Sequence, residues 1–200
     1  GTLSIRILAG RYGKIKIENS AAISDAQLKR MTHTLKEGAP IEGKPLETAL
    51  YNIAALCGIE AAGFLSPGTT FGTGDLTIRV KDGKRQSYVL YSENYGSEPS
   101  GRYRFGLQGS LENLTKSGDR LNLGLTLSNK DLHNYGISYS HPVGTDGTTL
   151  GIGVSRMDYE LSGAFRTLGA EGTADTLSIF GTTPLWRTAQ SSLAVTYGWD

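Results

Sequence analysis

The sequence offers few side chains whose types and spacing could perform bond chemistry. Its three histidines, His33, His133 and His141, are far apart, and none pairs with another at metal-ligand spacing on a helix. The single cysteine, Cys57, falls on the apolar face of a predicted helix, where a small core residue is expected rather than a nucleophile. No Gly-x-Ser-x-Gly or phosphate-loop motif is present. We therefore expect no enzyme, no catalytic residue, no cofactor and no metal site.

Three other polar groups have simple explanations. Asp158 and Glu160 lie on one face near a strand end, with no histidine or third carboxylate obviously beside them, so we expect solvated loop charges. Asn113-Leu-Thr115 fits a glycosylation sequon, but such triplets arise by chance and this one falls in a predicted tight turn. A basic cluster at 79–85 fits a solvated linker or, alternatively, a membrane-surface contact.

The composition narrows the classes of protein. The chain has 200 residues, of which 27 are glycine and 38% are hydrophobic, and its formal net charge is +1. This balance excludes a disordered chain and argues against bulk binding of nucleic acid. The glycines have no three-residue period, which excludes collagen, and no apolar run reaches the ~18 residues of a membrane-spanning helix. One or two globular domains or a transmembrane β-barrel remain.

The first part of the chain contains two helical patterns. Ser24 and Gln27 form a capping box, and the helix that they begin should end at Gly38. The apolar face of this helix carries Leu28, Met31 and Leu35. A second helix should start near Pro45 and end before Gly58, which suits a left-handed position. The apolar side of the second helix carries Leu46, Leu50, Ile53 and Cys57.

Strand-like runs flank the two helices at 14–18, 61–65 and 76–80, so the predicted order is β-α-α-β-β. Leu3–Leu8 predicts a further strand that has no partner upstream. If the run Ala61–Leu65 lies at the edge of its sheet, its unpaired N–H and C=O groups could accept an extended client strand. An edge strand that merely ends the sheet is an equal alternative.

After residue 84 the pattern changes to alternation of apolar and polar residues. Seven segments alternate in this way, at 86–93, 102–111, 120–128, 134–141, 149–155, 175–183 and 193–199. Tyr91 and Phe180 blur the faces of the first and the sixth segment. Turn-like sequences join the segments at 96–101, 117–119 and 144–147, and a longer loop is expected at 163–172.

These segments fit either a β-sandwich with its apolar face inward or a β-barrel with its apolar face toward lipid. Three properties favour the barrel: a length of about 8 to 10 residues, a polar face rich in small and hydrogen-bonding residues, and aromatic residues near the strand ends. Six or seven strands are too few to close a barrel.

Several sequence blocks, in the right order, resemble one family. Leu65-Ser-Pro-Gly-Thr-Thr-Phe-Gly-Thr-Gly-Asp-Leu-Thr-Ile-Arg-Val80 is similar to the segment that ends the periplasmic POTRA domain in two-partner secretion transporters. These are the haemolysin-activator and filamentous-haemagglutinin exporters (TpsB type). Tyr91–Tyr103, Leu111–Asp119 and Tyr139–Gly144 resemble that family's first barrel hairpin, first periplasmic turn and the end of its fourth strand.

The resemblance implies an α+β POTRA domain (β-α-α-β-β) at residues 11–84, preceded at 1–10 by the closing strand of another POTRA domain. Residues 85–200 would be the first six or seven antiparallel strands of an incomplete transmembrane β-barrel, which has sixteen strands in the family. The family's signal peptide, plug helix, first POTRA body and inward-loop motif are missing, so we expect an excerpt of a longer protein. Because open strand edges leave unpaired backbone groups, the isolated excerpt is expected to self-associate.

The implied function is protein translocation across the bacterial outer membrane, with the POTRA part in the periplasm and the barrel in outer-membrane lipid. The translocase would capture one secreted partner, a large adhesin or haemolysin, as an extended chain and export it without ATP. The expected edge contacts are Ala61, Ala62, Phe64 and Leu65, and the contacts of an alternative groove are Leu28, Met31 and Leu35. The expected lumen lining is Arg104, Gln108, Asn122 and Asn134. Outer-membrane barrel-insertion machinery and a soluble β-sandwich binding module remain as alternatives.

Overall fold

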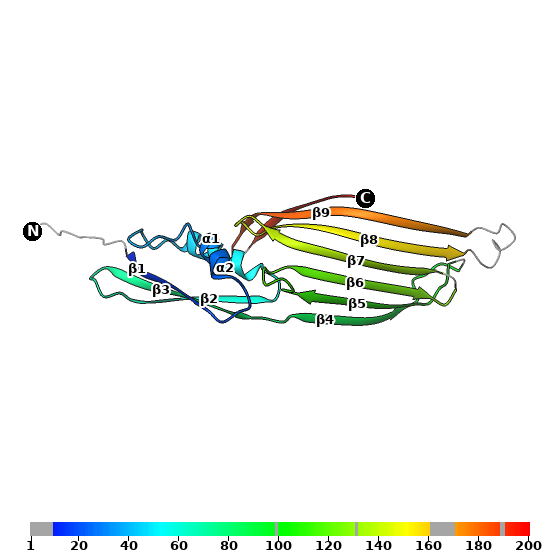
Figure 1. The fold of residues 1–200 in the computed structure, drawn as a ribbon, viewed down its shortest axis with the longest axis horizontal. Helices are drawn as coiled ribbons and strands as arrows, with labels where there is room; N and C mark the ends of the chain where they lie inside the picture. The colour runs from blue at the N-terminus through cyan, green and yellow to red at the C-terminus, as the bar shows by residue number, and fades with distance from the viewer. Residues whose placement is uncertain (1–9, 99, 131, 161–170, 189–190) are drawn as a thin grey trace, which may run out of the picture.

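The computed structural model describes residues 10–98, 100–130, 132–160, 171–188 and 191–200. They form two units that lie end to end, an amino-terminal unit with a small sheet and two helices, and a larger curved sheet (Figure 1). The strand expected at 3–8 lies outside the described residues, and so does most of the loop expected at 163–172.

The amino-terminal unit contains β1 (Arg11–Asn19), α1 (Asp25–Met31), α2 (Gly43–Ala54), β2 (Ile59–Pro67) and β3 (Thr73–Asp82). The elements follow one another as strand, helix, helix, strand and strand, as the patterns predict. In the sheet β3 lies in the middle, parallel to β1 and antiparallel to β2. β2 is therefore an edge strand, which fulfils the condition stated for the run Ala61–Leu65.

The core of the amino-terminal unit lies between its sheet and its two helices. Leu76, Ile78 and Val80 alternate along the central strand β3 and are fully buried. Leu28 and Ile53 reach the same core from the helical segments. Complete burial of one such side chain contributes about 1.5–3 kcal/mol, so these residues hold the helices on one face of the sheet.

Helix α1 begins as predicted and ends earlier. The Ser24 side chain accepts a hydrogen bond from the Gln27 N–H at 3.2 Å, which confirms the cap. The predicted end at Gly38 is wrong, because the helix stops at Met31 and the chain turns back toward β1. There the Gly38 N–H donates to the carbonyl oxygen of Tyr12 at 2.7 Å, a contact that a continued helix could not make.

Helix α2 starts two residues before Pro45 and ends at Ala54. Cys57, expected on its apolar side, lies beyond its end and is partly buried. Gly58 follows with a φ of +71°, the left-handed backbone that the sequence predicts there.

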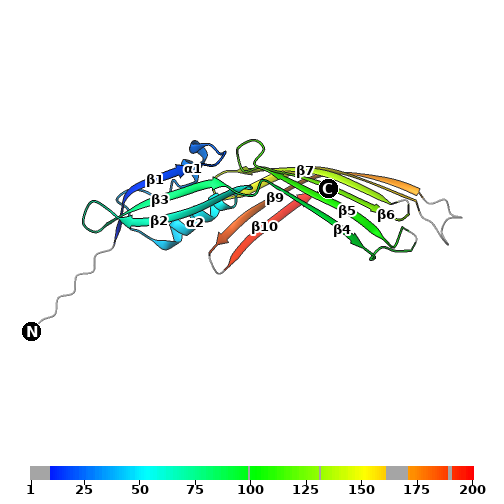
Figure 2. The same ribbon diagram turned by 90° about the horizontal axis from the view of Figure 1, so that it is seen from below.

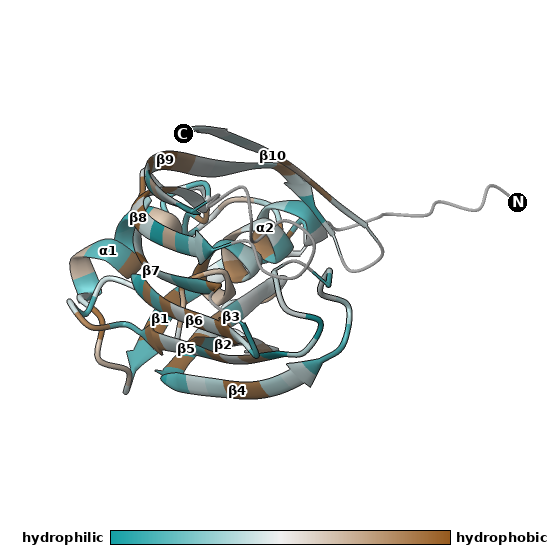
Figure 3. Ribbon diagram, turned by 90° about the vertical axis from the view of Figure 1, so that its right-hand side faces the viewer, coloured by the Kyte–Doolittle hydropathy of each residue, from teal (hydrophilic) through white to brown (hydrophobic). Residues whose placement is uncertain are grey.

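The larger sheet has the strand order β10-β9-β8-β7-β6-β5-β4, and all neighbouring pairs are antiparallel. Its strands are β4 (Gln86–Glu93), β5 (Arg104–Glu112), β6 (Arg120–Ser128), β7 (His133–Val143), β8 (Thr148–Glu160), β9 (Glu171–Arg187) and β10 (Ser192–Trp199). All seven alternating segments are strands. The sheet is curved, with β4 on one side of its concave face and β9 and β10 on the other (Figures 2 and 3).

Asp158 and Glu160 are not loop charges, because β8 extends through both. The Asp158 carboxylate accepts hydrogen bonds from the hydroxyls of Tyr135, at 3.0 Å, and Thr173, at 2.8 Å. It also pairs with Arg156 at 3.2 Å. Asp158 is therefore held by cross-strand bonds at the end of the sheet that is remote from the amino-terminal unit, where Glu160 lies opposite Glu171 of β9.

The apolar face of the larger sheet is on the surface of the described residues. Leu123, Ile137, Val154 and Leu177 are direct neighbours across four strands, and each is 43–51% exposed. A sandwich would bury this row under a second sheet, and no described strand packs on it. The β-sandwich alternative is therefore wrong for the described chain.

Candidate functional site

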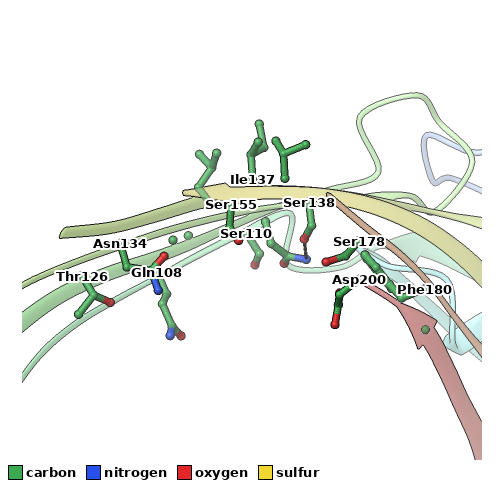
Figure 4. Close-up of a pocket in the computed structure, with 18 of the residues that line it drawn as sticks. Gln108, Ser110, Thr126, Asn134, Ile137, Ser138, Ser155, Ser178, Phe180 and Asp200 are labelled. Atoms are coloured by element: carbon green, nitrogen blue, oxygen red, sulfur yellow. Dashed lines mark hydrogen bonds between the residues drawn. The ribbon is translucent and has the colours of Figure 1, made fainter. Parts of the chain in front are cut away.

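The concave face of the larger sheet borders an open hollow of ≈ 870 Å³ whose lining includes several amide and hydroxyl side chains (Figure 4). Of the four residues predicted to line a lumen, Gln108, Asn122 and Asn134 line this hollow. Asn122 donates from Nδ2 to the hydroxyl of Ser138 at 3.3 Å. Figure 4 shows Gln108 and Asn134 on the side of the sheet opposite to Ile137. Alternation along each strand thus separates the polar lining from the apolar convex face.

Arg104 shares a face with Gln108 but does not line the hollow. It pairs with Glu93 on β4 across 3.8 Å, at the end of the sheet remote from the amino-terminal unit. A second pair, Arg120 with Glu112 at 2.7 Å, lies on the same face at the opposite end. The alternation places Arg120 on the same face as Asn122, but the spacing of residues alone does not predict this second pair.

Two aromatic residues that blur the alternation point to the concave face. The register places Tyr91 opposite Gly106 and Phe180 opposite Gly151, and in each pair the ring covers the glycine. A side chain on either glycine would overlap that ring. The two glycines thus leave room for the aromatic rings on the polar face. Cross-strand pairs of glycine with an aromatic residue stabilise curved sheets.

The open edge of β2 holds the predicted client contacts Ala61, Ala62, Phe64 and Leu65. The Gly68 N–H donates to Thr73 at 2.9 Å, and the Gly83 N–H donates to Gly58 at 2.8 Å. Since hydrogen-bonded pairs alternate along an antiparallel ladder, the even-numbered residues 60–66 bond to β3. The N–H and C=O groups of Ala61, Gly63 and Leu65 therefore face away from the sheet, where no described residue bonds to them.

The two sides of this open edge differ in character. On the helix side, Leu50 of α2 packs against Gly63, within 3.0 Å of the position where a Cβ would lie. On the other side, the guanidinium of Arg79 lies 4.8 Å from the ring centroid of Phe64 and pairs with Glu18 at 3.0 Å. Phe64 is 48% exposed. An added strand would therefore meet an aliphatic surface on one side and an aromatic and charged one on the other.

The alternative groove contacts are placed differently from the prediction. Leu28 and Met31 are core side chains, at most 4% exposed, so an incoming chain cannot touch them in this structure. Leu35 is also buried, but it lines a hollow of ≈ 450 Å³ together with Ile15 and Ile17 of β1. That hollow lies beside the other edge strand of the small sheet and is a second place where a chain could dock.

Within the described ranges, no helix has the length and apolar character that crossing a bilayer requires. The same residues contain no group of three or more His, Cys, Asp or Glu side chains placed to hold a metal ion. Of the basic cluster, Arg79 and Lys81 are ion-paired, with Glu18 and with Glu60 respectively.

Comparison with known proteins finds relatives of this arrangement. Residues 72–200 match the family of haemolysin secretion/activation proteins ShlB/FhaC/HecB. The chain is 32% identical over 196 residues, 97% of its length, to the heme/hemopexin transporter protein HuxB of Haemophilus influenzae. It spans 35% of that protein, about a third of its length.

Two solved structures share the fold. CdiB from Acinetobacter baumannii has a TM-score of 0.65 and 22% identity, over 96% of this chain and 37% of CdiB. BamA from Haemophilus ducreyi lacking POTRA domains 1-3 has a TM-score of 0.58 and 20% identity, over 94% of this chain and 35% of BamA.

Proposed function

Because this chain belongs to the ShlB/FhaC/HecB haemolysin secretion/activation family, the two-partner secretion transporters, we propose that it is part of an outer-membrane protein translocase. Residues 11–84 would be a POTRA domain in the periplasm, and residues 85–200 would be barrel wall. The domain captures one large secreted partner as an extended chain, and the barrel provides its path. No step requires ATP or bond chemistry.

The barrel-wall proposal is supported by the opposite character of the two sheet faces. The convex face carries the aligned apolar row of Leu123, Ile137, Val154 and Leu177, while the concave face carries amide and hydroxyl groups. A sheet with lipid on one side and water on the other has this distribution. Strands of 8 to 17 residues are also about long enough to cross a bilayer at a tilt.

The observation that carries the capture proposal is the open edge of β2. It offers the outward N–H and C=O groups of Ala61, Gly63 and Leu65 to an extended chain, which gives affinity without requiring one sequence. β3, the partner of β2, leads directly into the first strand of the larger sheet. The client would pass from this edge to the hollow lined by Gln108, Asn122 and Asn134.

Barrel-insertion machinery is the other function that this fold serves, and the likeness to BamA is one of fold alone, at 20% identity. The two functions differ in the client. A secretion transporter releases its client outside the cell, whereas insertion machinery leaves it in the membrane.

An export assay on the full-length protein tests the capture proposal. Ala61→Pro removes an outward N–H, and proline is tolerated at an edge strand. The matched variant is Ile17→Pro in β1. Because the Ser20 N–H donates to Val80 of β3, alternation along β1 directs the N–H of Ile17 away from the sheet. It points toward the hollow beside β1 that Leu35 also lines.

We expect Ala61→Pro to reduce export while barrel assembly is preserved, and Ile17→Pro to leave export near the parent level. The reverse result would move capture to the edge of β1. Normal export by both variants would contradict capture at an edge of this unit.

A further inference from the structure

The turn between β5 and β6, residues 113–119, fastens the amino-terminal unit to the larger sheet. We infer that Asn113 and Gly118 in this β5–β6 turn are positioning residues for export. They hold the open edge of β2 in a fixed direction relative to the mouth of the hollow. This inference rests on the proposed function, and its structural part can be measured separately.

Asn113 spans the junction between the two units. It is fully buried, although it lies in a turn, and its backbone is left-handed with a φ of +56°. Its Nδ2 donates to the carbonyl oxygen of Ala22 in the amino-terminal unit at 2.9 Å, while its Oδ1 accepts from the Gly118 N–H at 2.9 Å. One side chain thus joins the loop before α1 to the interior of the turn.

Gly118 lies directly against the amino-terminal unit. Its carbonyl oxygen accepts a hydrogen bond from the Cys57 N–H at 3.1 Å. A Cβ at this position would lie 2.6 Å from Cβ of Leu56 and 3.1 Å from its Cα, so the neighbouring backbone leaves no room for it. The φ of +80° adds a second reason for glycine.

Other bonds across the junction surround this contact. Gln27 of α1 donates to the Ser117 carbonyl oxygen at 3.0 Å, and Arg85 of the linker donates to that of Asn113 at 2.8 Å. Asn52 of α2 donates to the Thr145 carbonyl oxygen in the turn between β7 and β8 at 3.2 Å. Figure 1 shows α2 against the small sheet and close to the near ends of the strands of the larger sheet.

The position of these bonds along the chain relates them to the β2 edge. Cys57, which bonds to Gly118, lies two residues before the start of β2 at Ile59. The Gly83 N–H, after β3, donates to Gly58 at 2.8 Å. The anchored segment is thus the beginning of β2 itself. With only the linker 83–85 the unit could swing, whereas the β5–β6 turn supplies a second attachment that fixes its direction.

The chain provides a matched control for each positioning residue. Asn113→Gly keeps a residue that accepts the left-handed backbone and removes both side-chain bonds. Lys116→Gly makes the same change at an exposed position of the same turn, where φ is +61°. Gly118→Ala adds strain and a clash, whereas Gly144→Ala, at a φ of +70° in the turn after β7, adds strain in open surroundings.

The experiment uses the full-length protein in two measurements. Spin labels at Thr48 on α2 and Ala174 on β9, in a Cys57→Ser background, report the distance between the two units. Export of the partner is measured for Asn113→Gly, Gly118→Ala and their two controls in the unlabelled protein. Barrel assembly and the affinity of the amino-terminal unit for the partner are measured for the same four variants. A variant that only destabilises the fold would lower barrel assembly or the affinity for the partner. A variant that only loses the fixed direction of the β2 edge would leave both unchanged.

We expect Asn113→Gly and Gly118→Ala to broaden the distance distribution and to reduce export at least about fivefold relative to their controls, with assembly and affinity unchanged. An unbroadened distribution would overturn the role of the turn as the fastening. A broadened distribution with export equal to the controls would overturn the positioning role. If the parent protein exports no partner, the proposed function fails, and the distance measurement still decides whether the turn fastens the units.

Discussion

The ring of Tyr91 on β4 covers Gly106 on β5, and its hydroxyl lies 2.8 Å from the hydroxyl of Thr126 on β6. One side chain therefore ties three strands together on the concave face. Gly106→Val would displace the ring, and we expect a loss of about 1–3 kcal/mol in the free energy of unfolding, as for other overpacked sites.

Gly124 is the matched control, since it lies on the same face of β6 with nothing within 4 Å of a Cβ. The thermal unfolding midpoint of the full-length protein in detergent should fall for Gly106→Val and change little for Gly124→Val. Equal unfolding midpoints for the two variants would contradict the packing of the Tyr91 ring over Gly106.

The second prediction concerns charge on the concave face. Asn122→Asp places a carboxylate in the hollow, where it repels acidic segments of a passing chain and can no longer donate to the Ser138 hydroxyl. We expect export to fall while membrane insertion is preserved. Arg104→Glu should act in the same direction, because it converts the pair with Glu93 into two like charges.

Asn122→Ser keeps the position polar and neutral, and should export like the parent protein. A secretion assay with quantification of the inserted barrel checks both results. Normal export by Asn122→Asp and Arg104→Glu together would exclude this face as the client path.

Local patterns predicted the elements, since alternation and helical spacing are properties of neighbouring residues. They identified all seven strands of the larger sheet and the Ser24 cap. They failed where the end of an element depends on contacts between residues that are far apart in the sequence. The end of α1 at Met31 depends on the pairing of Gly38 with Tyr12, which the spacing of apolar residues does not encode.

The candidate site was partly predictable for the same reason. The strand pattern identified Gln108, Asn122 and Asn134, which line the hollow. It did not predict that the rings of Tyr91 and Phe180 cover glycines, because these pairs depend on the register between strands. The edge position of β2 depends on the sheet order, so the sequence could state it only as a condition. The role of Asn113 was missed, because a sequon in a turn gives no sign of burial against another unit.

The third prediction is a pH dependence in the β5–β6 turn. Burial opposes ionisation of Asp119, but hydrogen bonds from the Thr115 N–H, at 3.0 Å, and hydroxyl, at 2.9 Å, outweigh it and hold the pKa of this carboxyl below its usual value. A carboxyl with a lowered folded-state pKa stabilises the fold above its unfolded pKa of about 3.9. That contribution is lost as the pH falls through the folded-state pKa.

The protection of the Thr115 amide against hydrogen exchange should therefore be constant from pH 7 to 5 and should fall below about pH 4. Asp119→Asn should lower this protection at pH 7 and remove its dependence on acid. A loss of protection between pH 7 and 5 in the parent protein would contradict the assignment.

The fourth prediction concerns the 200-residue chain in isolation. β4 and β10 are the two edges of the larger sheet, and no described residue pairs with their outer sides. Backbone groups left unpaired in an apolar phase cost several kcal/mol each, so two chains should pair through these edges. Light scattering in detergent should give a mass above that of one chain, and a monodisperse monomer would contradict this expectation.

The most direct test of the central claim is residue-resolved hydrogen exchange of the full-length protein with and without an extended segment of its secreted partner. The outward amides of Ala61, Gly63 and Leu65 should gain protection when the segment binds. The amides of Ala62 and Phe64, which already bond to β3, should not change. This alternation along β2 is the result that capture at the open edge predicts. Binding of the segment without new protection at Ala61, Gly63 and Leu65 would contradict it.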